Sequence, residues 1–216
     1  MVHTNTERDP SFAERFIQVT GEKRIDVKPD LAQIQVEVLT EGTDITKAQQ
    51  ENAEKMNRVL QSLQSFNIPQ EDIQTASYNV SPRYDFIDGK QVFRGYSVTN
   101  SLLINIRDLD NVGSIIDTAT ENGANQISSL EFKLKDQDAH YNKVLQMALQ
   151  NAHGKAHALA TSLGLSYMPI PVEITEESNN APILFKSAAR SESARTTPII
   201  ANKVSIEAII TVKYRY

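Results

Sequence analysis

The stretch GYSVTNSLLINIRDLDNVGSIIDTATENGANQISSLEFKLKD, residues 95–136, decides the fold that we expect for this chain. Residues 101–107 are rich in β-branched and apolar side chains, which is typical of a strand. Residues 127–135 alternate between apolar and polar side chains, which is also typical of a strand. Between them, residues 109–120 carry apolar side chains at helical spacing, and Gly123 can end that helix in a left-handed conformation. The stretch therefore predicts a strand, a short helix and a strand, which form one βαβ unit.

The residues before this stretch show the same order of elements. Residues 32–38 alternate between apolar and polar side chains, which predicts a strand with one buried and one exposed face. Residues 45–66 carry an apolar stripe typical of an amphipathic helix, and residues 73–80 return to an extended pattern. Residues 16–27 predict a further strand, which we expect to pair with residues 32–38 as a hairpin.

The residues after the stretch complete the fold. The longest predicted helix covers about residues 138–163, and we expect one face of it to carry Ala148, Ala152, Leu159 and Leu163. A short strand is predicted at 172–175 and a closing strand at 203–214. We therefore expect an α+β protein with mixed, mainly antiparallel sheets packed against about three helices, arranged as two βαβ-like lobes.

Composition excludes several classes of protein. The 216 residues include 22 basic and 27 acidic side chains, a formal net charge of -5, whereas nucleic-acid binding needs a concentrated basic face. The chain has no cysteine, which excludes disulfides, thiolate metal sites and cysteine nucleophiles. No stretch reaches the roughly 18 apolar residues of a membrane span. We expect a soluble globular protein that binds no nucleic acid and has no transmembrane segment.

The first residues bear on domain organisation and compartment. Residues 1–15 are polar and carry mixed charge, which predicts a disordered arm, and residues 16–216 form the expected folded domain. The arm contains no apolar core of a signal peptide. As written, the chain is expected in the cytoplasm, and a periplasmic or other extracytoplasmic location is the alternative if a leader was trimmed.

Several short sequences resemble the SIMPL-domain family, a bacterial domain of unknown function. Each is weak alone, but the combination is specific and spans about residues 16–216. The sequences are VTGE at 19–22, VKPD at 27–30, DIQT at 72–75, VSP at 80–82, GY at 95–96, VTN at 98–100, VGSIID at 112–117, GAN at 123–125, Phe132 and LGL at 163–165.

The resemblance implies a two-lobed α+β subunit that forms large homo-oligomers. The family includes periplasmic immunogenic and oxidative-stress-linked proteins, and it supplies no catalytic residues. This chain departs from the family pattern because it lacks the typical leader peptide and, near residues 201–203, a glycine that often precedes the last strand.

Two histidines are the best candidates for binding a metal. His153 and His157 are four residues apart, which places both on one face of the predicted helix. Two imidazole side chains in this arrangement could hold zinc or nickel. Gly154 follows His153, so the catalytic H-E-x-x-H form is absent. The alternative is a solvated helix flank, and we expect no metal and no cofactor.

Residues for catalysis are also missing. Gly113-Ser114 does not form the elbow that holds a nucleophilic serine. The acidic pairs at 71–72 and 176–177 lie at the edges of predicted elements, where solvated acids are expected rather than a glycosidase pair. We expect no catalytic residues.

A predicted flexible loop at about 177–198 is one candidate interaction segment. It is rich in Ser, Ala, Asn and Arg, and it carries Phe185, Lys186 and Arg190. It is either an arm that orders when it contacts a partner or another subunit, or a disordered surface loop.

An aromatic hairpin is the second candidate. Asp88-Gly89 is the strongest hairpin signal in the chain, and five aromatic residues surround it: Tyr78, Tyr84, Phe86, Phe93 and Tyr96. They form either an exposed patch for another subunit or cross-strand pairs that cover a small core.

The function expected from these features is non-enzymatic. We expect a self-assembling, protein-binding chain, and the resemblance implies a role in envelope or stress physiology. The alternative is an enzyme or small-ligand binder whose site forms between subunits.

Overall fold

The computed structural model describes residues 15–177, 183–184 and 196–216, which divide into two compact units. Unit 1 comprises 15–27, 136–177, 183–184 and 205–216, and unit 2 comprises 28–135 and 196–204. Within the described residues, three α-helices pack on two antiparallel sheets. The predicted α+β class is therefore confirmed. None of the described helices is long and apolar enough to cross a membrane.

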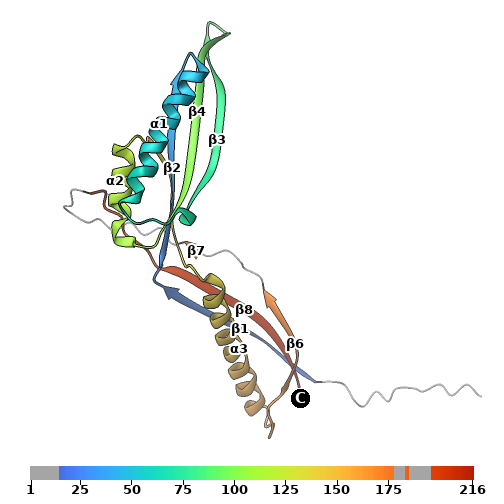
Figure 1. Cartoon of the computed structure of the whole chain (residues 1–216). Coiled ribbons are helices and arrows are strands. Elements are labelled where there is room, and N and C mark those ends of the chain that lie inside the picture. The colour runs from blue at the N-terminus through green and yellow to red at the C-terminus, as the bar shows by residue number, and fades with distance from the viewer. Residues whose placement is uncertain (1–14, 178–182, 185–195) are drawn as a thin grey trace, which may run out of the picture. The chain divides into compact units, whose positions relative to one another are not determined.

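Unit 2 contains a four-stranded sheet with its helices on one face (Figure 1). Its elements are β2 (Leu31–Gly42), α1 (Ile45–Gln64), the 3-10 turn η1 (Gln70–Asp72), β3 (Ile73–Ile87), β4 (Lys90–Ile106), the 3-10 turn η2 (Leu109–Asn111), α2 (Val112–Glu121) and β5 (Gln126–Lys133). The strand order is β3-β4-β2-β5, and all neighbours are antiparallel.

The predicted βαβ unit is present in a split form. β4 and β5 are each antiparallel to β2, which lies between them, so β4 and β5 are parallel to each other without pairing. The segment β2-α1-β3 is split by β4 in the same way. The two segments therefore interlock as in ferredoxin-like folds.

Local chemistry fixes the ends of α1. Asp44 caps its start, because Oδ1 accepts hydrogen bonds from the backbone N–H groups of Thr46 at 2.8 Å and Lys47 at 3.2 Å. Beyond its end, Asn67 has a positive φ of 53°, a conformation that asparagine tolerates better than most residues. Helix α2 is followed by Gly123 with φ of 121°, as predicted for a helix stop.

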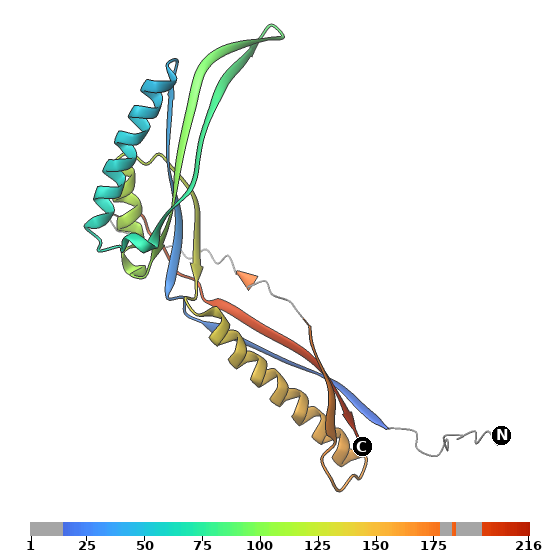
Figure 2. The ribbon, with the colours of Figure 1, turned by 45° about the vertical axis from the view of Figure 1, so that its right-hand side comes forward.

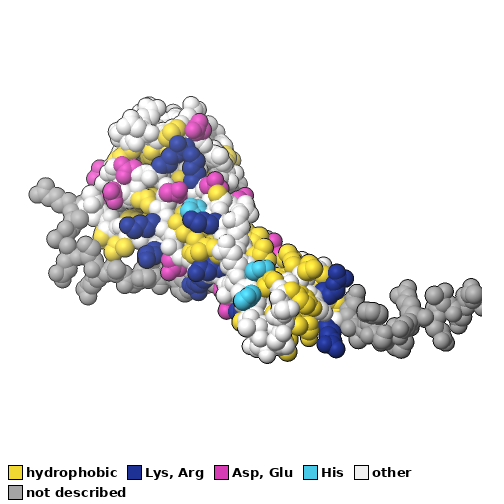
Figure 3. Space-filling model, turned by 90° about the horizontal axis from the view of Figure 1, so that it is seen from below, with side chains coloured by type: hydrophobic (Ala, Val, Ile, Leu, Met, Phe, Trp, Pro, Cys, Tyr) yellow, Lys and Arg dark blue, Asp and Glu magenta, His cyan; other side chains and the backbone are white. Residues whose placement is uncertain are grey.

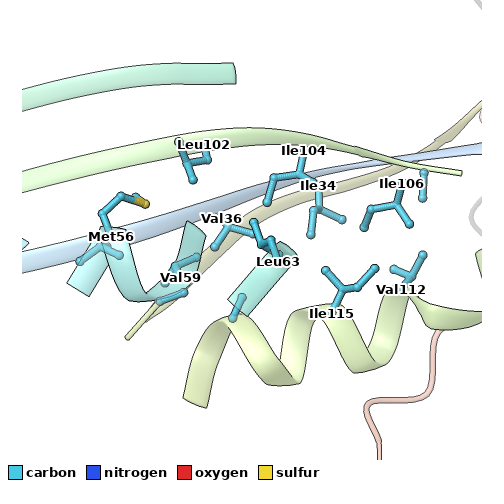
Figure 4. Packing of buried hydrophobic residues seen from close by; sticks show 14 residues of the cluster. Ile34, Val36, Met56, Val59, Leu63, Leu102, Ile104, Ile106, Val112 and Ile115 are labelled. Atoms are coloured by element: carbon cyan, nitrogen blue, oxygen red, sulfur yellow. The ribbon is translucent and has the colours of Figure 1, made fainter. Parts of the chain in front are cut away.

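The core of unit 2 lies between the sheet and its helices. Figure 4 shows the side chains of alternate residues on β2 and β4 pointing toward α1 and α2, with Val36 and Ile104 among them. Asn52 of α1 is buried in this region, and its Nδ2 donates hydrogen bonds to the carbonyl oxygens of Val38 at 2.8 Å and Val98 at 3.0 Å. One polar side chain thus ties α1 to both central strands.

Unit 1 is built on a second sheet. Its elements are β1 (Phe16–Val27), α3 (Gln137–Ser162), β6 (Ile170–Glu177), β7 (Ile183–Leu184) and β8 (Val204–Arg215). β8 lies between β1 and β6, and β7 also pairs with β8. The predicted hairpin of residues 16–27 with 32–38 is therefore wrong, because β1 and β2 belong to different sheets. Alternation specifies which face of a strand is buried but not which strand pairs with it.

Helix α3 packs on β1 through its smallest side chains. Its buried residues are Val144, Ala148, Ala152, Ala156 and Ala160. A Cβ placed on Gly21 of β1 would lie only 2.2 Å from the carbonyl oxygen of Ala148, so glycine and alanine together permit this close approach. Contrary to the predicted face, Leu159 and Leu163 are exposed, because the row of alanines turns toward the sheet instead.

Candidate functional site

The predicted aromatic hairpin extends beyond the rest of its sheet. The pairing of β2 with β4 ends at Gly42 and Tyr96, whereas β3 and β4 continue to pair from Arg83 and Gly95 to Ile87 and Lys90. Figures 1 and 2 show this continuation as a two-stranded ribbon, which we call the β-arm and define as residues 83–95. Neither face of the β-arm is buried by a further layer of unit 2.

The backbone of the β-arm depends on glycine and aspartate at two points. At the tip, Asp88 and Gly89 have φ of 49° and 74°, which confirms the predicted tight turn. At the base, Gly95 has φ of 126°, and a Cβ there would lie 2.4 Å from the carbonyl oxygen of Gly42. The register of β3 and β4 shifts between Arg83 and Tyr84, beside this glycine. The β-arm therefore leaves the sheet at a bulge that only glycine accommodates.

One face of the β-arm is aromatic. Tyr84 lies directly opposite Phe93, and their rings meet edge to face with centroids 5.7 Å apart. Phe93 also meets Tyr96 at the base, with centroids 5.3 Å apart. Phe86 lies nearer the tip, and 77% of it is exposed. Tyr84 and Phe93 remain 46% and 47% exposed, so their pairing does not bury them.

The opposite face carries charge and aliphatic side chains. Arg94 Nε donates to Asp85 Oδ2 at 2.6 Å, and Val92 lies directly opposite Asp85 on the neighbouring strand. Arg83 pairs with Glu41 at the base. The two faces of one ribbon thus differ in chemistry: one is aromatic, and the other combines an ion pair with aliphatic side chains.

Tyr78 is not part of the β-arm. It lies further along β3, and its hydroxyl accepts a hydrogen bond from Gln49 Nε2 of α1 at 3.3 Å. The structure therefore brings together Tyr84, Phe93 and Tyr96, with Phe86 on the same ribbon, and leaves Tyr78 further along β3, beside α1.

The other predicted interaction residues, Phe185, Lys186 and Arg190, lie outside the described residues, as does most of the predicted loop 177–198. The described end of that loop is attached to α2. Thr197 donates to Asp117 through its backbone N–H at 2.8 Å and through Oγ1 at 2.5 Å, and these hydrogen bonds hold the pKa of Asp117 below its ordinary value.

The two candidate metal ligands lie on the exposed side of α3. His153 and His157 are both exposed, and the ring of His153 lies 6.0 Å from the ring of Tyr214. Among the residues that the structure describes, no three His, Cys, Asp or Glu side chains gather as a metal site would require.

Burial raises the pKa of Tyr214, whose hydroxyl has no hydrogen-bond partner within the described part of the chain.

The acidic pairs have structural contacts. Glu176 of β6 accepts a hydrogen bond from the Tyr141 hydroxyl at 2.5 Å, which raises the pKa of Tyr141 to about 12. Asp72 is ion-paired with Arg107 at 2.9 Å.

Gly113 and Ser114 lie in α2, and a Cβ on Gly113 would meet the carbonyl oxygen of Thr197.

Sequence reasoning missed a second apolar surface, on unit 1. Every residue of β6 is exposed, including Ile170, Val172 and Ile174. Leu163 and Tyr167, which follow α3 in the chain, are also exposed. Figure 3 shows hydrophobic side chains gathered on the surface of unit 1. The apolar residues at every second position of β6 were the available signal, but they cannot tell a covered face from an open one.

Comparison with known proteins gives consistent matches. The model of the SIMPL family, described as a protein of unknown function (DUF541), matches residues 17–214. The 26 kDa periplasmic immunogenic protein of Brucella melitensis is 31% identical over 209 residues, which cover 92% of this chain and 83% of that protein. The uncharacterized protein YggE of Escherichia coli (strain K12) is 27% identical over 194 residues, which cover 90% and 78%.

Proposed function

The chain belongs to the SIMPL family of proteins of unknown function, and from this premise we propose that it works by protein contact rather than catalysis, first of all by assembling with copies of itself. The observation that carries the proposal is the aromatic face of the β-arm. A two-stranded ribbon without a covering layer is only marginally stable in water. Exposed aromatic side chains on such a ribbon are typical of a surface that binds another protein.

A second copy offers a fitting surface for the β-arm. β6 exposes Ile170, Val172 and Ile174, and it carries three glutamates, Glu173 among them. Two of the three basic side chains of the β-arm, Arg83 and Arg94, are already paired with Glu41 and Asp85, so charge adds little. Apolar contact therefore favours the β-arm of one copy on β6 of the next. A contact between two different surfaces of one chain is head-to-tail, and it gives a closed ring or a filament.

The experiment that tests the proposal is the absolute mass of the full-length protein by light scattering during size-exclusion chromatography, at several concentrations. We expect a discrete mass several times the 24.1 kDa of one chain. Phe86→Ser should reduce the mass without lowering the melting temperature, because Phe86 contacts no other ring among the described residues. Tyr84→Ala with Phe93→Ala should lower both.

Matched variants separate this contact from general surface effects. Ile87→Ser lies next to Phe86 on the opposite face of the β-arm and should leave the mass unchanged. Ile174→Ser on β6 should reduce it as Phe86→Ser does. A wild-type mass of one chain at every concentration, or equal effects of Ile87→Ser and Phe86→Ser, contradicts the proposal.

We also place this assembly outside the cytoplasm, with a role in the cell envelope or under oxidative stress. The support is the name of the Brucella relatives, the 26 kDa periplasmic immunogenic protein, and the link to stress defence that the family resemblance implies. Fractionation of the native host tests the location, and recovery of the protein with cytoplasmic markers alone would contradict it.

A further inference from the structure

The middle of β6 presents an apolar side chain on the face of its sheet that α3 occupies. Ile174 is directly opposite Val212 of β8, and Glu176 is directly opposite Ile210. Residues opposite each other on paired strands point to the same face of a sheet. Val212 and Ile210 are buried core residues of unit 1. On the same face, the Tyr141 hydroxyl of α3 donates a hydrogen bond to Glu176. Ile174 therefore lies on the α3 side of the sheet, yet it is 55% exposed.

The opposite face of β6 is polar from residue 173 onward. Glu173 is directly opposite Lys213, and Thr175 is directly opposite Thr211. Oγ1 of Thr211 also donates a hydrogen bond to Glu177 at 2.8 Å. An apolar partner of this part of β6 therefore finds its contact surface on the α3 side of the sheet.

One flank of α3 borders this part of the sheet. Residues four apart in a helix lie on one side of it, so the row that begins at Tyr141 and ends at His153 contains Leu149. Tyr141 reaches Glu176 of β6. The ring of His153 lies 6.0 Å from the ring of Tyr214 on β8. Both ends of the row therefore face this side, and Leu149 between them is exposed.

The other flank of α3 faces β1. Oδ1 of Asn151 accepts a hydrogen bond from the backbone N–H of Glu22 at 3.3 Å. Nζ of Lys155 donates to the carbonyl oxygen of Thr20 at 2.8 Å. Leu159 follows Lys155 by about one turn on this flank and is also exposed. Helix α3 thus carries an exposed leucine on each flank, and the flank with Leu149 is the one that borders β6.

The β-arm has the length and the apolar surface to cover this region. Its strand at 83–87 extends about 17 Å, and the row of α3 from Tyr141 to His153 extends about 18 Å. An aromatic side chain buries about 150–250 Å², and a stable interface buries about 800 Å² on each partner. The exposed parts of Tyr84, Phe86 and Phe93 therefore supply a substantial share of the area that a stable contact needs.

We propose that the aromatic face of the β-arm of one copy packs on the α3 side of β6 in the next copy, against both Leu149 and Ile174. This contact rests on the proposed self-assembly. It adds the side of β6 that is used and makes the flank of α3 with Leu149 a part of the acceptor surface.

Two leucines of one helix supply the test. In the full-length protein, Leu149→Ser should raise the concentration at which half of the chains are assembled at least about tenfold, as measured by light scattering. Leu159→Ser makes the same chemical change on the other flank and should leave that concentration unchanged. Melting temperatures of both variants identify any loss of folding.

Introduced thiols report the contact without removing the aromatic side chains, because the chain has no cysteine of its own. Gln91 is directly opposite Phe86, so it lies on the aromatic face of the β-arm. Chains that carry Gln91→Cys and Leu149→Cys should be joined to each other by a short bismaleimide. Chains that carry Gln91→Cys and Leu159→Cys should not.

The outcomes separate this contact from self-assembly itself. Equal effects of Leu149→Ser and Leu159→Ser, or equal crosslinking of the two cysteine pairs, overturn the contact with α3. Self-assembly through the β-arm still stands in that case if Phe86→Ser reduces the mass. A wild-type mass of one chain at every concentration overturns both.

Discussion

The contact between β1 and α3 can be tested by adding one methyl group. In Gly21→Ala, the new Cβ would lie 2.2 Å from the carbonyl oxygen of Ala148 and 2.7 Å from Cβ of Ala152. Real Cβ contacts are not shorter than 3.0 Å, so the helix must move away from the strand. Neither obstacle is a flexible side chain, because one is backbone and the other is the first carbon of a buried residue.

The size of the effect follows from this geometry. Overpacking of a core lowers the free energy of unfolding by about 1–3 kcal/mol. Because the clash here is with helix backbone, we expect a loss of about 3 kcal/mol. With a urea m value of about 2 kcal/mol/M, the unfolding midpoint of unit 1 should fall by about 1.5 M. Movement of α3 would also loosen the packing along its row of alanines, which adds to the loss.

Urea unfolding followed by circular dichroism measures the effect, and a glycine in α3 supplies the control. Gly154 is exposed and has nothing within 4 Å of an added Cβ, so Gly154→Ala should stabilise the helix by about 0.5–1 kcal/mol. The same chemical change is thus expected to act in opposite directions at the two positions. If Gly21→Ala leaves the midpoint unchanged while Gly154→Ala raises it, the packing of α3 on β1 described above is refuted.

Three further outcomes are expected. Asn52→Leu should lower the free energy of unfolding by about 2 kcal/mol in chemical denaturation, because two backbone carbonyl groups lose their buried donor; a loss below about 0.5 kcal/mol would contradict this role. The hydrogen bond to Glu176 raises the pKa of Tyr141 from 10.0 to about 12, so its stabilising effect is complete below pH 10 and is lost as the pH rises toward 12. Unfolding midpoints of Tyr141→Phe should therefore fall less than those of the wild type over that range, and parallel curves would disprove it. Asp117→Asn should speed amide hydrogen exchange at Thr197, because the carboxylate that accepts its N–H is replaced by a weaker acceptor, and an unchanged exchange rate would argue against this attachment.

The strands and helices of unit 2 were largely predictable, because their periodicity reflects burial on one face. The alternation at 32–38 corresponds to residues that point in turn to the core and to solvent along β2. The Asp88-Gly89 turn was predictable for a local reason as well, since both residues tolerate positive φ. Signals of this kind depend only on neighbours in the sequence.

Properties that depend on distant partners were not predictable. The exposure of Leu159 on α3 depends on Gly21, which is far away in the chain and lets the alanines approach β1. The aromatic residues of the β-arm were identified, but their exposure depends on β2 ending at Gly42 while β4 and its partner β3 continue. A cavity beside Asp72 is lined by residues from 65–72 and from 105–115, which are far apart in the chain, so neither stretch alone contains its signal.

The position of β8 has a consequence for the order of folding. β8 is the last strand in the chain, yet it lies in the middle of its sheet, between β1 and β6. On a ribosome, residues 28–135 emerge as one continuous segment that supplies the whole sheet of unit 2 and can fold early. β1 must wait until nearly the whole chain has been synthesised before its partner exists. During that interval its unpaired edge is open to chaperones and to other chains.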